Sequence, residues 1–229
     1  MNRFFVNKKE DNYFILDKEA QKHIKVLRLD GKKIICVYEN NFFECLVDFD
    51  KAHIIKEINE NHELQNDIIL LMSLIKYDRF EWLLQKSTEL GVKKIIPLIT
   101  EHTNGELYSF NKFEKKRQRF EEILKNAAEQ SFRNQIPTLG ELTKLSNIDF
   151  KKDYKIYIAH EKINSENNQI PSEIEKNVYF VVGPEGGFSN LELDKLVLDN
   201  KNVNLVSLGK RILRAETAAI YMLSKIKNS

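Results

Sequence analysis

The second two-thirds of the chain alternates between short apolar runs and amphipathic stretches, and this alternation constrains the fold most strongly. Ile68 to Ile75, Lys94 to Ile99 and Val178 to Val182 are apolar runs of strand length. Stretches with apolar residues at helical spacing separate them. Because strands that are buried on both faces are apolar throughout, the pattern predicts an α/β fold with a mainly parallel sheet.

Several helix starts in this region carry capping signals. Asp78 with Glu81, and Ser189 with Glu192, have the spacing of a capping box, in which the two side chains bond the first free amides of a helix. Further elements are expected as helices at residues 111–130 and 214–227 and as strands at residues 154–159 and 203–208.

The first 66 residues follow a different pattern, with several short strand-like segments around one helix that Asp17 can cap. The strands are expected at residues 3–6, 12–16, 34–38, 42–49 and 52–58. So many short strands in so short a segment predict a small β-barrel domain. The polar stretch from Asn59 to Asp67 is the expected linker. We therefore predict one domain over residues 1–66 and a second over residues 67–229.

Composition limits the classes of function. The net charge is only +2, so any contact with nucleic acid has to come from local basic groups. No apolar run approaches the roughly 20 residues of a membrane span, and the N-terminus lacks the features of a signal peptide. We expect a cytoplasmic protein without a membrane partner. Cys36 and Cys45 are not expected to form a disulfide in that compartment, and the scattered histidines indicate no metal site.

Two glycine-containing loops are the candidate ligand site. The segment Gly183 to Gly187 follows a buried strand, at the end of a parallel strand where α/β proteins bind ligands. Taken alone, it is equally consistent with an ordinary strand-to-helix turn. In the second loop Gly209 turns the chain, and Arg211 and Arg214 bracket two apolar residues. An ordinary loop with solvent-facing arginines is the alternative for this segment.

Together these loops resemble the RsmE family of SPOUT methyltransferases, which methylate uridine N3 in ribosomal RNA. Residues 183–187 match the family's Gly-Pro-Glu-Gly-Gly motif without a change, and residues 208–218 match its Leu-Gly-x-Arg-x-Leu-Arg-x-Glu-Thr-Ala motif. Further matches lie at residues 3–4, 23–28, 85–92 and 128–133. The sequence departs from many family members at Lys210, where they have Pro, and at Phe132, where they have Gly.

The resemblance implies a trefoil knot in the second domain, a PUA-like first domain that helps to hold RNA, and a homodimer. It implies S-adenosylmethionine as cofactor and, as substrate, a uridine near the 3′ end of 16S rRNA in the assembled small ribosomal subunit. The cofactor-binding residues that it implies are Val182, Gly183, Pro184, Glu185, Gly186, Gly187, Leu208, Gly209, Arg211, Ile212, Leu213 and Thr217.

Methylation of uridine N3 requires removal of the imide proton and stabilisation of the uracil anion. Our candidates for the cationic role are Arg211, Arg214 and Arg133, because an arginine is always charged. Glu129 or Glu216 is the candidate proton acceptor, although each has an alternative role, in an ion pair or as a helix cap. The candidate RNA-binding residues are Arg3, His23, Lys25 and Arg28.

Trp82 lies near the start of an apolar helix and is expected in the core rather than as a base-stacking platform. The basic residues between 112 and 119 are expected to form a solvated helix face.

Two other functions remain open at this stage. One is a SPOUT enzyme that methylates the ribose 2′-oxygen of tRNA, which the matches in the first domain and at residues 128–133 argue against. The other is an RNA-binding ribosome assembly factor without catalysis, which the intact loop motifs argue against.

Overall fold

The computed structural model describes residues 1–161, 168–171 and 176–226, and the chain divides into two compact units. Unit 1 comprises Met1–Glu63 and Lys125–Ile136, and unit 2 comprises Leu64–Leu124 and Pro137–Ser229. The predicted boundary after residue 66 places residues 125–136 in the second domain. The structure assigns them to unit 1, because their side chains and backbone bond to that unit.

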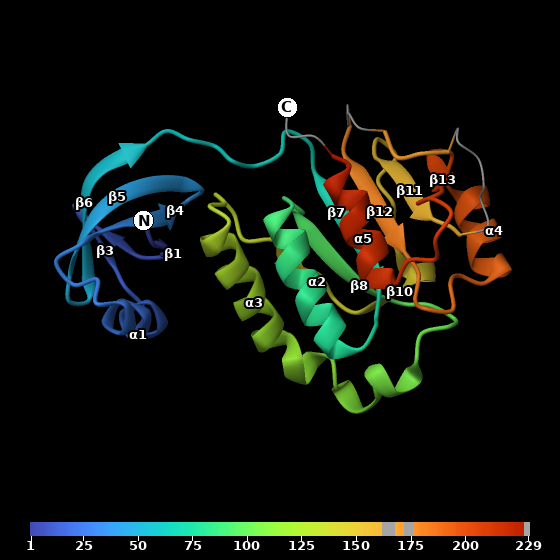
Figure 1. Ribbon diagram of the computed structural model, residues 1–229, viewed down its shortest axis with the longest axis horizontal. Helices are drawn as coiled ribbons and strands as arrows, with labels where there is room; N and C mark the ends of the chain where they lie inside the picture. The colour runs from blue at the N-terminus through green and yellow to red at the C-terminus, as the bar shows by residue number, and fades with distance from the viewer. Residues whose placement is uncertain (162–167, 172–175, 227–229) are drawn as a thin grey trace. The chain divides into compact units, whose positions relative to one another are not determined.

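Unit 1 is built on a six-stranded sheet that forms a half-barrel (Figure 1). Its strand order is β1 (Arg3–Phe5), β4 (Lys33–Tyr38), β5 (Asn41–Asp48), β6 (Lys51–Ile58), β3 (Tyr13–Ile15) and β2 (Lys9–Glu10). The β1–β4 pair is parallel and the other neighbours are antiparallel. β1 and β2 are the two edges of this sheet. The one helix of the half-barrel, α1 (Lys18–Leu27), begins as predicted, with the Asp17 side chain accepting from the Ala20 amide at 2.7 Å.

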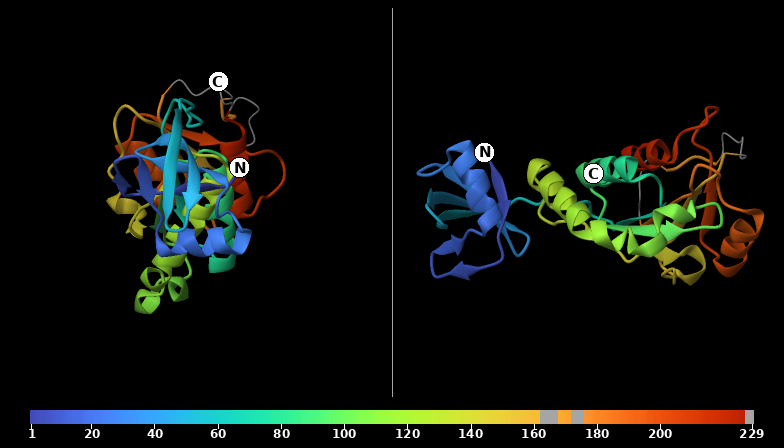
Figure 2. Two further views of the ribbon diagram at one scale, coloured as in Figure 1. Left: turned by 90° about the vertical axis from the view of Figure 1, so that its left-hand side faces the viewer. Right: turned by 90° about the horizontal axis from the view of Figure 1, so that it is seen from below.

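Unit 2 contains a seven-stranded sheet in which every recorded strand pair is parallel. Its order is β10 (Thr143–Lys144), β8 (Lys94–Ile99), β7 (Ile68–Ser73), β12 (Val178–Val182), β11 (Lys155–Ala159) and β13 (Val203–Val206), with β9 (Thr138–Leu139) also beside β8. The predicted α/β fold with a mainly parallel sheet is confirmed. Because the strands are parallel, the loops that follow them gather at one edge (Figures 1 and 2).

Helices cover both faces of this sheet, which explains why its central strands β7 and β12 are buried along their whole length. α2 (Tyr77–Glu89), α5 (Ala215–Ser224) and the unit 2 part of α3 (Arg117–Gln130) pack on one face, together with Leu70 and Met72 of β7. α4 (Asn190–Asp199) packs on the other face, against Ile69 and Leu71 of β7. Alternate side chains of β7 thus point to opposite faces of the sheet and pack into two separate hydrophobic cores.

Some predicted helix boundaries are wrong. The helix expected from residue 111 begins at Arg117, after 3₁₀ turns at Gly105–Leu107, Ser109–Asn111 and Glu114–Lys116. Phe110 and Asn111 have φ of 53° and 55°, and this left-handed backbone cannot continue a right-handed helix.

The capping box expected at Asp78 is also wrong. α2 begins at Tyr77, so Asp78 lies inside the first turn, and the Glu81 carboxylate instead accepts from Arg119 at 2.6 and 2.7 Å. The box at Ser189 is confirmed, with both of its hydrogen bonds to and from Glu192.

Near the C-terminus β13 ends at Val206 rather than Leu208, and α5 spans Ala215–Ser224. Lys227, the predicted end of the last helix, lies outside the described residues. Among the helices that the structure describes, none is both long and apolar enough to cross a membrane.

Candidate functional site

The loops after β11, β12 and β13 surround a cavity of ≈ 260 Å³ in unit 2. Its walls include the segments 159–161, 182–188 and 208–213, with Ala215 and Ala218 of α5. The two candidate loops are therefore brought together around one cavity, and it lies at the carboxyl ends of the strands. All the predicted cofactor-binding residues line it except Thr217, which lines a neighbouring cavity.

Glycine is required at two positions of the first loop for different reasons. Gly187 has φ of +70°, and its amide donates to the Pro184 carbonyl at 2.9 Å to close the turn. A Cβ on Gly183 would lie 3.1 Å from the ring of Phe188 and 3.3 Å from the carbonyl carbon of Gly187. The loop is thus a tightly packed turn whose backbone is open to the cavity.

Gly183→Ala is expected to weaken binding of a ligand in this cavity by about tenfold, because the added methyl group pushes the turn outward at a cost of about 1–3 kcal/mol. Calorimetry with S-adenosylmethionine measures the effect. Gly105→Ala is the matched control, since a Cβ there meets only the Tyr108 side chain, at 3.7 Å or more. An unchanged affinity for the Gly183 variant would show that the turn does not shape the binding site.

His102, which sequence reasoning missed, supports the first loop from the end of β8. Its Nδ1 lies 3.1 Å from the carbonyl oxygens of both Gly186 and Gly187. Because both partners are acceptors, Nδ1 carries a proton and donates. No local pattern marks an isolated histidine 84 residues before its partner, so only the packing of β8 beside the site reveals it.

The second loop carries exposed cationic side chains. Gly209 has φ of +105°, which turns the chain just beyond β13. Arg211 and Arg214 are exposed, and Ile212 is 86% exposed on the same loop. Arg211 and Ile212 line this cavity, whereas Arg214 lines a neighbouring one.

A second cavity of ≈ 380 Å³ is lined by Asp78, Arg79, Trp82, Arg214, Glu216 and Thr217. Arg79 forms an ion pair with Glu185 of the first loop, and its Nε lies 3.9 Å from Glu216 Oε1. Glu216 is only 7% exposed, and its Oε2 has no hydrogen-bond partner among the described residues.

Trp82 is 44% exposed, so the prediction that it belongs to the core is wrong. The residues of α2 that pack in the core include Phe80 and Leu83, on the opposite face of the helix.

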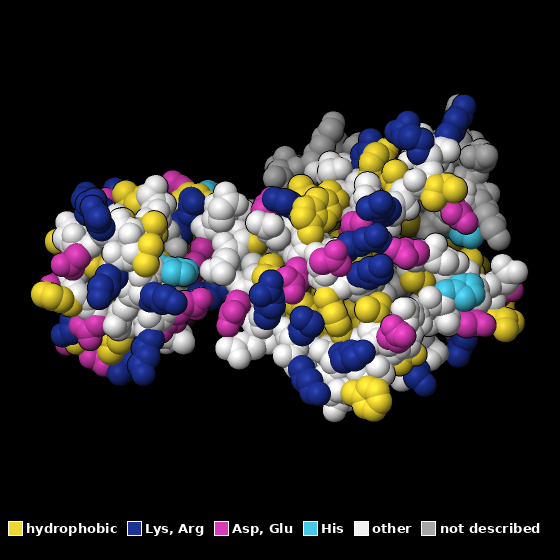
Figure 3. All heavy atoms as spheres, turned by 60° about the horizontal axis from the view of Figure 1, so that its bottom comes forward, with side chains coloured by type: hydrophobic (Ala, Val, Ile, Leu, Met, Phe, Trp, Pro, Cys, Tyr) yellow, Lys and Arg dark blue, Asp and Glu magenta, His cyan; other side chains and the backbone are white. Residues whose placement is uncertain are grey.

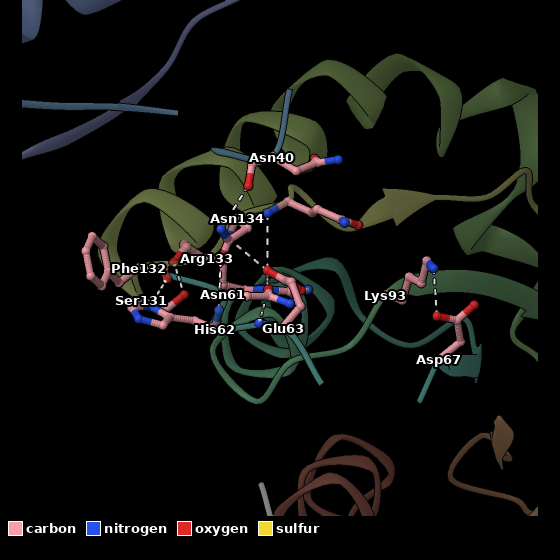
Figure 4. A network of polar contacts seen from close by, with 12 residues as sticks. Asn40, Asn61, His62, Glu63, Asp67, Lys93, Ser131, Phe132, Arg133 and Asn134 are labelled. Atoms are coloured by element: carbon pink, nitrogen blue, oxygen red, sulfur yellow. Dashed lines mark hydrogen bonds and ion pairs between the residues drawn. The ribbon is translucent and has the colours of Figure 1, made fainter. Parts of the chain in front are cut away.

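Two predicted catalytic residues, Glu129 and Arg133, belong to unit 1, whereas Arg211, Arg214 and Glu216 belong to unit 2. The guanidinium of Arg133 is buried and paired with the Glu63 carboxylate, with Nε at 3.2 Å from Oε1 (Figure 4). The same carboxylate accepts from the Asn134 amide at 2.9 Å.

Glu129 is held by β1. Its Oε1 accepts from the Phe5 amide at 3.0 Å, and burial raises the pKa of this carboxyl to about 7. Arg3, a predicted RNA contact, donates to the Glu129 and Gln130 carbonyls at 2.6 and 2.9 Å, with its guanidinium 4.7 Å from the centre of the Phe132 ring. These contacts tie residues 125–136 to the half-barrel.

Glu129→Gln is expected to remove a pH dependence of stability. The pKa of Glu129 is about 7 in the folded state against 4.5 for the free group. Between these values the folded protein keeps a proton that the unfolded chain has released, so the stability of unit 1 falls as pH rises through this window. The loss is about 3 kcal/mol by pH 8. The glutamine still accepts from Phe5 but cannot ionise.

Urea unfolding at pH 5 and pH 8, followed by hydrogen exchange of unit 1 amides, measures this difference. Glu122→Gln, an exposed carboxylate on the same helix, is the control and should keep the wild-type pH dependence. Wild-type stability that is equal at both pH values would contradict the assignment.

The other predicted RNA-binding residues lie on or just after α1. Lys25 and Arg28 are exposed and His23 is half-buried. The basic residues between 112 and 119 are largely engaged within the protein: Arg117 with Glu114 and Arg119 with Glu81 are examples. Cationic and anionic side chains are interspersed on the face that Figure 3 shows, as the small net charge predicts.

Comparisons with known proteins agree with this geometry. The family described as RNA methyltransferase domain matches residues 62–227. The Ribosomal RNA small subunit methyltransferase E of Mesomycoplasma hyopneumoniae is 36% identical over 98% of both chains. The protein of the same name from Bacillus subtilis is 32% identical over 99% of this chain and 96% of its own.

Solved structures give the same result. A structure from Legionella pneumophila with the cofactor SAM bound is 31% identical, with a TM-score of 0.82 over 98% of this chain and 96% of its own. The Ribosomal RNA small subunit methyltransferase E of Neisseria gonorrhoeae, bound to S-adenosyl methionine, is 26% identical with a TM-score of 0.83, over 98% of this chain and 95% of its own. The chain therefore belongs to the RNA methyltransferase family. Relatives that match almost the whole chain include ribosomal RNA small subunit methyltransferases E.

Proposed function

We propose that this protein transfers a methyl group from S-adenosylmethionine to N3 of a uridine near the 3′ end of 16S rRNA. The observation that carries the proposal is the single cavity formed by the loops 182–188 and 208–213 at the carboxyl ends of parallel strands. Whole-chain similarity to ribosomal RNA small subunit methyltransferases E supports the rRNA substrate.

The residues around the cavity suit S-adenosylmethionine. Val182, Leu208 and Leu213 offer apolar surface for a purine ring, and the turn backbone at Gly183 and Gly209 offers hydrogen-bonding groups without side chains in the way. The solved relatives with SAM or S-adenosyl methionine bound support this choice. When bound, the cofactor supplies an electrophilic methyl group on a positively charged sulfur.

The side chains of the chain itself supply the remaining chemistry. Neutral imide nitrogen is a poor nucleophile, so the N3 proton has to leave and the anion needs a cationic neighbour. We assign the cationic role to Arg211 and Arg214 and the proton to Glu216. We assign Glu129 and Arg133 to holding unit 1 together, since a backbone amide and Glu63 already engage them.

We further propose the trefoil knot, the PUA-like character of unit 1, and a homodimer that acts on the assembled small subunit in the cytoplasm. The topology supports the knot. β13 is an edge strand, yet α5, which follows it, packs against β12 and α2 near the middle of the sheet. The half-barrel of unit 1, with exposed Lys25 and Arg28 beside it, supports a role in holding RNA.

The test is methyl transfer by the purified protein to small subunits isolated from cells that lack its gene. Nucleoside mass spectrometry should detect 3-methyluridine in the rRNA, and tRNA incubated with the protein in a parallel reaction should gain no 2′-O-methylated nucleoside. A 2′-O-methylated tRNA product would favour the second SPOUT function. Failure to bind S-adenosylmethionine in calorimetry would favour an assembly factor without catalysis.

A further inference from the structure

The cavity between the N-terminal ends of α2 and α5 is lined by Arg214 and Glu216, which the proposed function uses, and by Arg79 and Trp82, which it does not use. Arg79, which lines it, pairs with Glu185, which lines the cavity between the two loops, so one ion pair links the two cavities. We propose that this second cavity receives the target uracil, with Arg79 and Trp82 as recognition residues that no sequence motif assigned. This inference rests on the proposed function, because it takes a uridine as the ligand.

The orphan oxygen of Glu216 indicates that the cavity awaits a hydrogen-bond donor. A buried carboxylate oxygen without a donor is costly, and buried polar groups in native proteins are nearly always satisfied. The nearest cationic nitrogen, Arg79 Nε, lies 3.9 Å from the other oxygen, and the Arg79 guanidinium bonds Glu185 instead. Rotation about the terminal torsion of the glutamate exchanges its oxygens, so either of them can face a ligand.

The polar groups of the cavity match the pairing edge of uracil. That edge presents one imide N–H between two carbonyl oxygens, so it requires an acceptor with donors around it. Glu216 is the acceptor, and the guanidinium groups of Arg79 and Arg214 are the donors. Cytosine has no proton on N3 and would place a lone pair against the carboxylate. The cavity therefore selects uracil over cytosine.

Trp82 provides the apolar surface that an unpaired base needs. It is a large aromatic side chain, 44% exposed, one helical turn from Asp78 on the face of α2 that lines the cavity. Bases that leave a helix stack on such side chains, and each stacking contact contributes about 1–3 kcal/mol. An exposed tryptophan beside an unsatisfied carboxylate is thus explained by a base between them.

The same arrangement explains how the N3 proton of uracil is removed. The N3–H bond breaks as the Glu216 carboxylate gains the proton, and the bonding electron pair stays on N3. The negative charge on uracil then faces Arg79 and Arg214 at the N-terminal ends of two helices, where the helix dipoles also favour an anion. The carboxylic acid returns its proton to water after the product leaves.

The single tryptophan of the chain makes the proposal directly testable, because Trp82 is the only source of tryptophan fluorescence. Tri-uridylate and tri-cytidylate RNA are titrated in the presence of S-adenosylhomocysteine, so that no methyl transfer occurs. We expect tri-uridylate to quench the fluorescence with an affinity about tenfold tighter than tri-cytidylate. Glu216→Gln should abolish this preference and Arg79→Met should reduce it, whereas Arg119→Met, which removes an exposed arginine bonded to α2, should leave it unchanged.

Methyl transfer by the same preparations separates the possible failures. Trp82→Ala should raise KM for small subunits more than it lowers kcat, and Trp82→Phe should restore KM. Equal quenching by both RNAs, or none, from a wild-type protein that does produce 3-methyluridine would overturn the uracil subsite and leave the proposed function intact. A wild-type protein that makes no 3-methyluridine would overturn the proposed function itself.

Discussion

Arg133→Ala is expected to destabilise unit 1 by about 3–5 kcal/mol, because it leaves the Glu63 carboxylate buried without its counter-charge. The Arg133 side chain is 5% exposed and that of Glu63 is 14% exposed, so water cannot replace the lost partner. The backbone amides of Asn134 and Gln135 still donate to the carboxylate but carry no full charge. Urea unfolding followed by hydrogen exchange of unit 1 amides measures the loss.

Lys8→Ala is the matched control within unit 1, since it breaks a solvent-exposed ion pair with Glu10 and should not move the unfolding midpoint. Glu63→Gln combined with Arg133→Met should recover part of the lost stability by removing both charges. An Arg133→Ala protein of normal stability that has lost methyl transfer would contradict the structural role and restore the catalytic role that the sequence suggested.

Arg211→Ala is expected to lower the rate of methyl transfer by about 10²–10³-fold, the usual effect of removing one group that stabilises developing negative charge. Arg211 lines the loop cavity and is exposed, so its loss should not affect folding. Single-turnover rates at saturating S-adenosylmethionine and small subunits measure the effect, with filter binding of the subunits alongside.

Lys201→Ala is the control for this variant, because it removes an exposed cation of unit 2 that lines neither of the two cavities. Its rate should stay close to that of the wild type. If Arg211→Ala weakens subunit binding as much as it slows turnover, Arg211 is an RNA contact and the anion of uracil is stabilised elsewhere.

The sequence predicted the parallel sheet and both glycine-containing turns because these depend on local signals. Continuous apolar runs mark strands that are buried on both faces, and Gly187 and Gly209 occupy positions where φ is positive. The capping box at Ser189 was predicted correctly for the same reason. The start of α3 was not, because Phe110 and Asn111 adopt the left-handed conformation without a glycine to signal it.

Features that depend on tertiary contacts could not be predicted from the sequence. Arg79 and His102 join the site through partners 106 and 84 residues away, and neither stands in a motif of the two loops. Trp82 was misplaced because an apolar helix offers several inward positions and periodicity does not decide which one stays exposed. Conversely, the family match at residues 128–133 made Arg133 a candidate for the cationic role. Its ion pair with Glu63 is a tertiary contact that the sequence does not show.

The modification that this protein installs in rRNA tests the proposed function most directly. Methylation at N3 blocks base pairing, so it stops reverse transcription one nucleotide before the modified uridine. Primer extension on small-subunit rRNA from wild-type cells and from cells lacking the gene tests this directly. We predict a stop near the 3′ end that disappears in the deletion strain and returns with the wild-type gene but not with Arg211→Ala. A stop that persists in the deletion strain would contradict the proposed function.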